Sequence, residues 1–193
     1  MVAAMRPERL NALTDGVVAI VLTIMVLELK FPAENTFAAV MEVLPLLAAY
    51  LLAFSYVGLY WNNHHHMMQS AQRVTGLVLW TNHALLFCLT LFPLMIRWIG
   101  EAGVTPWPVA SFGIVLAGAA LTFRMLQWAL AAAASEGARI REVVQHPLKE
   151  YSSLAIYLAA IAVAFWSPYV SVAMYVAVAL IWIVPDRRFA RHR

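Results

Sequence analysis

The chain has 193 residues, of which 63% are hydrophobic and 12% are charged, and its mean hydropathy is +0.76. Soluble domains carry about 45–50% apolar and about 25% charged residues. A soluble domain, a disordered chain and a coiled coil are therefore excluded. A single cysteine, Cys88, excludes a secreted disulfide scaffold. The composition predicts an all-α integral membrane protein, and the net charge of +3 must be explained by where the basic residues lie.

Six stretches are long and apolar enough to cross a bilayer, which takes roughly 20 residues. We expect a single six-helix transmembrane domain over residues 1–193, with helices at about 10–29, 40–61, 74–96, 108–134, 151–166 and 169–184. Only Ser167 and Pro168 separate the last two, which predicts a tight helical hairpin. The first helix contains Asp15 and Glu28 and lacks the pattern of a cleavable signal peptide.

The basic residues indicate the orientation, because they concentrate in cytoplasmic loops. With cytoplasmic N- and C-termini, the outer side receives only Lys30 and Arg97. The inner side receives Arg6, Arg9, Arg73, Arg124, Arg139, Arg141, Lys149, Arg187, Arg188, Arg191 and Arg193. Arg124 falls within the fourth apolar run, so it either snorkels or lies at the inner rim. This asymmetry supports an even number of spans and needs no nucleic-acid partner.

The start of the first helix carries a recognisable motif. Arg9, three intervening residues, then Leu13, Thr14 and Asp15 resemble the Arg-x-x-x-Phe-Ser-Asp signature of the transmembrane protein 175 family of potassium channels. Further matches are Ile20–Ile24 in the same helix, Trp61-x-x-His64-His65 ending the second, and Leu79-Trp80-x-Asn82 in the third. The resemblance implies a potassium-permeable homotetramer in a bacterial plasma membrane, with the first helices at the axis and no cofactor.

One face of the first helix carries Gly16, Ile20, Thr23, Ile24 and Leu27, at 100° per residue. From the residues alone, such a stripe is typical of lipid contact or core packing. The resemblance implies that it lines a pore, with Ile20, Thr23 and Leu27 at the matching positions and Ile24 beside them. Isoleucine or leucine rings would gate by dewetting, and a threonine ring would offer oxygen ligands to potassium. No Thr-Val-Gly-Tyr-Gly sequence is present, so no re-entrant selectivity-filter loop is expected.

Asp15 lies nearly opposite this stripe, roughly 7–8 Å inside the inner end of the helix. Polar residues of the second and third helices fall at similar depth, and buried polar groups must be paired. We therefore expect a packing hub that joins the first three helices, with ion binding by Asp15 as the less favoured alternative. Its expected members are Arg9, Leu13, Thr14, Asp15, Trp61, Asn62, His64, Asn82 and His83.

His64, His65 and His66 end the second helix. Consecutive helical residues point about 100° apart, so one helix cannot present all three to one metal ion. We expect an interfacial cap whose inward histidine packs against a neighbouring helix, with pH sensing as the alternative. At the outer end, Glu28, Lys30 and Glu34 indicate either a solvated helix end or a weakly negative vestibule that Lys30 partly cancels.

The sequence contains no phosphate-binding loop, metalloprotease motif or nucleophile elbow, so we expect no enzyme. The alternatives to a potassium channel are a proton-permeable channel and a secondary transporter. A transporter should show two similar halves or helices broken at matching positions, and no internal repeat is visible.

Overall fold

The computed structural model describes residues 7–30, 32–135 and 148–183. These residues form helices and no extended strand, which confirms the all-helical prediction. Four helical stretches are long and apolar enough to cross a membrane, namely α1, α2, the consecutive pair α3–α4, and α5. The helices are α1 (Pro7–Leu27), α2 (Phe37–Met68), α3 (Gly76–Thr90), α4 (Phe92–Ala102), α5 (Pro106–Ala133), α7 (Leu148–Val163) and α8 (Pro168–Ile183).

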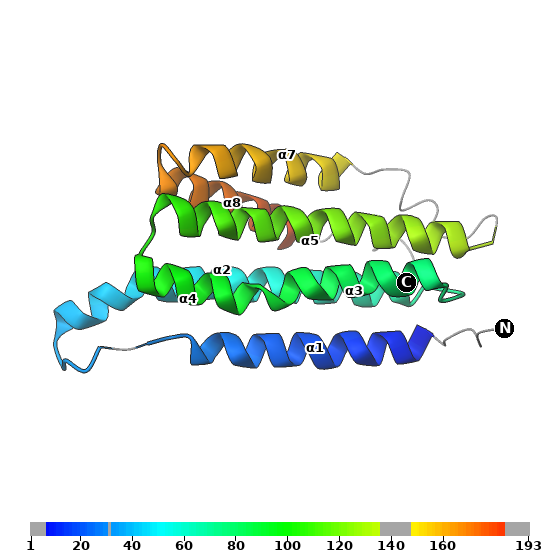
Figure 1. Cartoon of the computed structure of the whole chain (residues 1–193), viewed down its shortest axis with the longest axis horizontal. Helices are drawn as coiled ribbons and strands as arrows, with labels where there is room; N and C mark the ends of the chain where they lie inside the picture. The colour runs from blue at the N-terminus through cyan, green and yellow to red at the C-terminus, as the bar shows by residue number, and fades with distance from the viewer. Residues whose placement is uncertain (1–6, 31, 136–147, 184–193) are drawn as a thin grey trace.

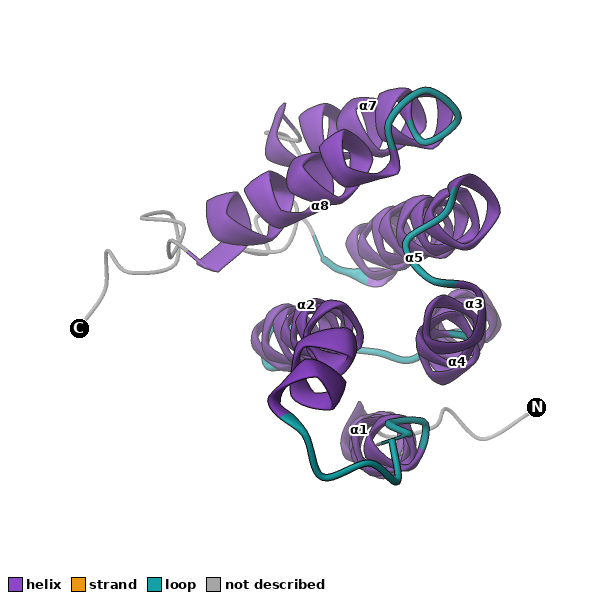
Figure 2. Ribbon diagram, turned by 90° about the vertical axis from the view of Figure 1, so that its left-hand side faces the viewer, coloured by secondary structure: helices purple, strands orange, loops and turns teal. Residues whose placement is uncertain are grey.

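The helices stack in layers, seen end-on in Figure 2. α1 lies on one side of the bundle, α2 and the α3–α4 pair lie over it, and α5 covers α3 and α4. The antiparallel α7 and α8 lie on the far side, packed on α5, with α8 also touching α2 (Figures 1 and 2). α1 packs on α2, α3 and α4, so it forms an outer layer whose remaining face has no neighbouring helix among the residues that the structure describes.

α2 is 32 residues long and continues beyond Trp61, where the expected span ends, to Met68. The Thr36 hydroxyl caps its start by accepting a hydrogen bond from the Ala39 N–H. Pro45 interrupts the first turns, which bend away from the rest of the helix in Figure 1. The last two turns stay helical because Met67 and Met68 are buried in the core. Hydropathy marks only the apolar part of this helix, so it underestimates the length.

The third expected helix, 74–96, is two helices that meet at Leu91. Pro93 has no N–H, so the Leu89 carbonyl cannot receive the usual bond from four residues ahead, and the helix is interrupted just before this point. α4 then continues to Gly103, whose φ of 73° is a conformation that favours glycine and ends the helix.

A cluster of buried tyrosines fixes the α7–α8 hairpin to the bundle. Tyr56 on α2 donates its hydroxyl hydrogen to the Tyr175 carbonyl on α8 at 2.7 Å. Tyr157 on α7 donates to the Tyr56 hydroxyl at 3.3 Å, and Tyr175 donates to the Val109 carbonyl on α5 at 3.2 Å. Because each hydroxyl reaches another helix, the cluster sets both the position and the rotation of the hairpin.

Candidate functional site

α1 has one buried face and one exposed face. The buried face packs against α2, α3 and α4 and carries Leu10, Thr14, Val18, Val21 and Met25. The exposed face includes all five residues of the stripe seen in the sequence: Gly16, Ile20, Thr23, Ile24 and Leu27. Ile20 is 58% exposed and Leu27 is 77% exposed, although both are large apolar side chains. Such a surface must be covered by lipid or by another protein surface.

Thr23 is the polar member of the exposed stripe. Its Oγ1 lies 3.0 Å from the Ala19 carbonyl and 2.9 Å from the Ile20 carbonyl, so the hydroxyl hydrogen is directed into the helix backbone. The oxygen therefore keeps its lone pairs outward on the exposed face. In this geometry Thr23 can offer an oxygen ligand to a cation, and its hydrogen does not point at that cation.

Asp15 is half-buried at the edge between the two faces of α1. The Trp61 indole on α2 donates a hydrogen bond from Nε1 to Asp15 Oδ1 at 2.8 Å. The Trp61 ring also stacks on His65, with ring centroids 5.9 Å apart and planes inclined by 26°. The carboxylate is thus directed sideways toward α2 and away from the exposed stripe.

A second polar contact joins the same three helices in the core. His64 on α2 lies with Nε2 2.8 Å from Asn82 Oδ1 on α3, and Asn82 Nδ2 donates to Thr14 Oγ1 on α1 at 3.1 Å. Thr14 passes its own hydrogen to the Leu10 carbonyl at 3.1 Å. Because the Asn82 oxygen faces the ring, His64 must carry its proton on Nε2. All three side chains are buried, and the chain of bonds has a defined direction.

The remaining expected hub members lie outside these contacts. Arg9 and Asn62 are exposed, and Leu13 lies on the exposed side of α1 next to the stripe. His83 turns back on its own helix, with Nδ1 2.8 Å from the Leu79 carbonyl and its ring against Trp80. Within the described residues, none of these four is hydrogen-bonded to the Asp15–Trp61 pair or to the chain from His64 to Thr14.

The three consecutive histidines point in different directions. His64 is buried, His65 is half-buried with its Nε2 2.9 Å from Gln69 Nε2, and His66 is exposed. No group of three potential metal-ligating side chains occurs among the residues that the structure describes. Within the same part of the chain, His64 Nδ1 is buried without a hydrogen-bond partner.

At the opposite end of α1, the two basic residues that are expected on the outer side share one acid, which no sequence motif marks. Glu101 Oε1 lies 3.2 Å from Lys30 Nζ and 3.1 Å from Arg97 Nε. The charge of Lys30 is therefore compensated by Glu101 on α4 and not by Glu28. The pairing joins residues 71 positions apart, which no local pattern could have indicated.

Arg124, which falls within the fourth apolar run of the sequence, is buried inside the bundle. Its Nη1 donates to Gln127 Oε1 at 3.0 Å, and the guanidinium lies 5.2 Å from the Trp128 ring centroid and 5.6 Å from the Tyr151 ring centroid. The hydrogen bond to Gln127 stays within α5, and the cation–π contact with Tyr151 links α5 to α7.

Comparison with known proteins identifies a family and relatives of this chain. The sequence model of the family described as "Endosomal/lysosomal potassium channel TMEM175" matches residues 9–93. A protein named as a potassium channel from Chryseobacterium sp. (strain P1-3) is 42% identical over 183 residues, covering 95% of each chain. Another so named, from Chamaesiphon minutus (strain ATCC 27169 / PCC 6605), is 31% identical over 186 residues, covering 89% of this chain and 91% of its own.

The fold is also similar to a solved structure. The crystal structure of a lysosomal potassium-selective channel TMEM175 homolog from Chamaesiphon minutus superposes with a TM-score of 0.80. The match covers 92% of this chain and 96% of that chain, at 22% sequence identity. At this identity the likeness concerns the arrangement of the helices.

Proposed function

The chain belongs to the TMEM175 family, and from this membership we propose that it forms a potassium-permeable cation channel whose pore is lined by α1. It is a multi-pass membrane protein, and because the family consists of channels it is not an enzyme, as the sequence predicts. The proposed pore surface is the exposed stripe of α1, made of Ile20, Thr23, Ile24 and Leu27.

The exposed stripe is the observation that carries this proposal. α1 is an outer layer of the subunit and turns large apolar side chains, together with Thr23, away from the core. One helix cannot enclose a path, so several copies must bring their α1 helices together around an axis. We propose a homotetramer in a bacterial plasma membrane, with six spans per subunit and both termini in the cytoplasm.

Conduction then follows from the chemistry of the stripe. Rings of Ile20, and of Ile24 or Leu27, would form narrow apolar collars that empty of water when closed and so block ions. The Thr23 ring lies between them along the helix and offers oxygen lone pairs to a partly dehydrated potassium ion. Selectivity would rest on this ring and on the pore radius.

The contacts behind α1 would keep the stripe in register. Asp15 is held by Trp61, and Thr14 by Asn82, so two neighbouring residues of α1 are fixed to two different helices. This arrangement restricts rotation of α1 about its axis, which would otherwise move Ile20 and Thr23 off the pore. We propose this positioning role for the hub and no direct ion contact for Asp15.

The test is potassium release from proteoliposomes, with internal pH followed in parallel. We expect passive potassium flux, and a several-fold rise for Ile20→Asn, because a polar ring keeps the collar hydrated. The matched control is Ile114→Asn on α5, since Ile114 is 59% exposed and Ile20 is 58% exposed. Absent flux, or equal effects of both substitutions, would contradict the pore assignment. Proton flux without potassium flux would indicate a proton channel, and saturable flux coupled to a second ion a transporter.

A further inference from the structure

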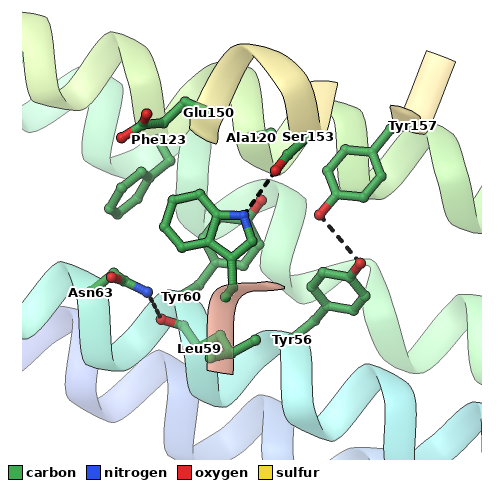
Figure 3. A pocket seen from close by; sticks show the side chains of 10 residues that line it. Tyr56, Leu59, Tyr60, Asn63, Ala120, Phe123, Glu150, Ser153 and Tyr157 are labelled. Carbon is green, nitrogen blue, oxygen red and sulfur yellow. Dashed lines mark hydrogen bonds between the residues drawn. The ribbon is translucent and has the colours of Figure 1, made fainter. Parts of the chain in front are cut away.

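A cavity lies on the far side of the subunit from the proposed pore surface, between α2, α5, α7 and α8. Its empty volume is about 450 Å³, including the open space at its mouth. Half of the residues that line it are aromatic, and one is an acid (Figure 3). The lining residues are Tyr56, Leu59, Tyr60, Asn63, Ala120, Phe123, Glu150, Ser153, Tyr157 and Trp182.

The aromatic walls are held in place by contacts of their own. Trp182 donates its indole hydrogen to Ser153 Oγ at 2.9 Å, which fixes its ring against α7. Tyr60 and Phe123 meet edge to face, with centroids 5.8 Å apart. Tyr56 and Tyr157 belong to the tyrosine cluster that anchors the hairpin. The cavity is therefore preorganised, so a ligand would not have to order these side chains.

The polar groups of the cavity offer acceptors more than donors. Among the described residues that line the cavity, Glu150 is the one acid, and no lysine or arginine accompanies it. Its Oε2 is buried and has no hydrogen-bond partner within the described part of the chain. Asn63 spends an amide hydrogen on the Leu59 carbonyl at 2.7 Å, and Ser153 donates to the Lys149 carbonyl at 2.7 Å. A buried carboxylate oxygen without a partner calls for a cation or a hydrogen-bond donor.

The Trp182 ring already attracts a cation. Lys149, which does not line the cavity, places its Nζ 4.9 Å from the centroid of that ring. The electron-rich face of an aromatic ring favours positive charge, and tryptophan does so most strongly. Lys149 also repels a second cation nearby, so a ligand must be drawn mainly by Glu150 and by the rings of Tyr60, Phe123 and Tyr157.

We propose that this cavity binds an organic ammonium ion, with the positive nitrogen among the aromatic rings and against Glu150. Aromatic walls and a single carboxylate suit a weakly hydrated organic cation. Potassium would lose its hydration shell there and gain too few oxygen ligands in return. The same chemistry occurs in free amines and in the amine headgroups of membrane lipids. Because α7 and α8 form the outermost layer of the subunit, both sources have to be tested.

The first arm of the test measures binding of choline to the purified full-length protein in dodecyl maltoside, a detergent without an amine. The neutral control is 3,3-dimethylbutan-1-ol, which has the shape of choline and no charge. We expect choline to raise the unfolding temperature saturably and the alcohol to have little effect. Glu150→Gln should weaken choline binding roughly tenfold, whereas Glu42→Gln, which removes an exposed acid from α2, should leave it unchanged.

A second variant guards against a change in folding. Phe123→Leu keeps an apolar side chain but removes one aromatic wall, so we expect weaker choline binding and an unfolding temperature close to that of the unliganded wild type. A site for a free amine is overturned if choline and the alcohol act alike, or if both Glu150→Gln and Phe123→Leu bind choline as the wild type does.

The second arm distinguishes the source of the ammonium group. Phosphatidylethanolamine is added to the detergent-solubilised protein, with phosphatidylglycerol as the lipid without an amine, and bound lipid is measured by native mass spectrometry. Retention of the ethanolamine lipid by the wild type, lost in Glu150→Gln, identifies a headgroup site. Choline binding without such retention identifies a site for a free amine. If the protein shows no choline binding and no lipid retention, the proposed site is refuted, whatever the channel conducts.

Discussion

Trp61 Nε1 lies 2.8 Å from Asp15 Oδ1 and makes a hydrogen bond that ties α1 to α2. Trp61→Phe removes this bond and keeps an aromatic ring. We expect a loss of about 1 kcal/mol in unfolding free energy, because the site is only partly shielded from solvent. Thermal unfolding in detergent measures it. Trp80→Phe on α3 is the control, since Trp80 is more exposed than Trp61. Equal effects would mean that the Asp15 bond adds no stability.

Asn82 holds two partners at once, His64 and Thr14, inside the core. Asn82→Leu leaves the His64 Nε2 hydrogen buried without an acceptor, so we expect a loss of about 1–3 kcal/mol in unfolding free energy. Thr14→Val should lose less, because only one bond between helices disappears. The control is Thr90→Val, whose hydroxyl bonds its own helix at the Phe87 carbonyl and is exposed. A double-mutant cycle between Thr14 and Asn82 should show coupling, and strict additivity would contradict the network.

Gly113 on α5 is a point of close approach between the α7–α8 hairpin and the bundle. A Cβ at this position would overlap the Tyr175 hydroxyl and the Ile161 side chain, both of which are packed in place. We expect Gly113→Ala to lower stability by about 1–3 kcal/mol through overpacking. Gly58→Ala on α2 is the matched control, because a Cβ there meets nothing within 4 Å. That variant should be neutral or stabilising by up to about 1 kcal/mol.

Glu101 compensates both Lys30 and Arg97 near the C-terminal end of α1. Glu101→Gln leaves two positive charges there, so we expect lower potassium flux in proteoliposomes at low ionic strength. Lys30→Gln should shift flux in the opposite direction. Both differences should vanish near 1 M salt, where the Debye length is about 3 Å. A deficit that persists at high salt would point to a structural effect and away from surface potential.

The sequence predicts which polar residues of neighbouring helices lie at the same depth in the bundle, because depth depends only on position along each helix. The rise of a helix is the same everywhere, so counting residues from the helix ends that are predicted to be cytoplasmic places Asp15 level with Trp61 and Asn82. The choice of partner at that depth depends on how each helix is rotated. α2 is apolar on most of its faces, so its sequence does not distinguish His64, which is buried, from Asn62, which is exposed.

Features made by distant segments could not be predicted in this way. The pairing of Lys30 with Glu101 needs α4 to continue past the break at Leu91, and hydropathy merges α3 and α4 into one span. The cavity arises from four helices and from the packing of Tyr60, Phe123 and Trp182, which in the sequence are ordinary aromatic residues. Aromatic residues near span ends are typical of membrane anchors, so no local signal distinguishes a cavity wall from an anchor.

Tyr60 and Trp61 are consecutive residues of α2, yet Tyr60 lines the cavity beneath α7 and α8 and Trp61 holds Asp15 on α1. Successive side chains of a rigid helix turn together, by the same angle and in the same sense. A twist of α2 that widened the cavity around Tyr60 would therefore carry Trp61 along and pull on α1. α2 therefore couples the cavity beneath α7 and α8 to the surface of α1 at the proposed axis.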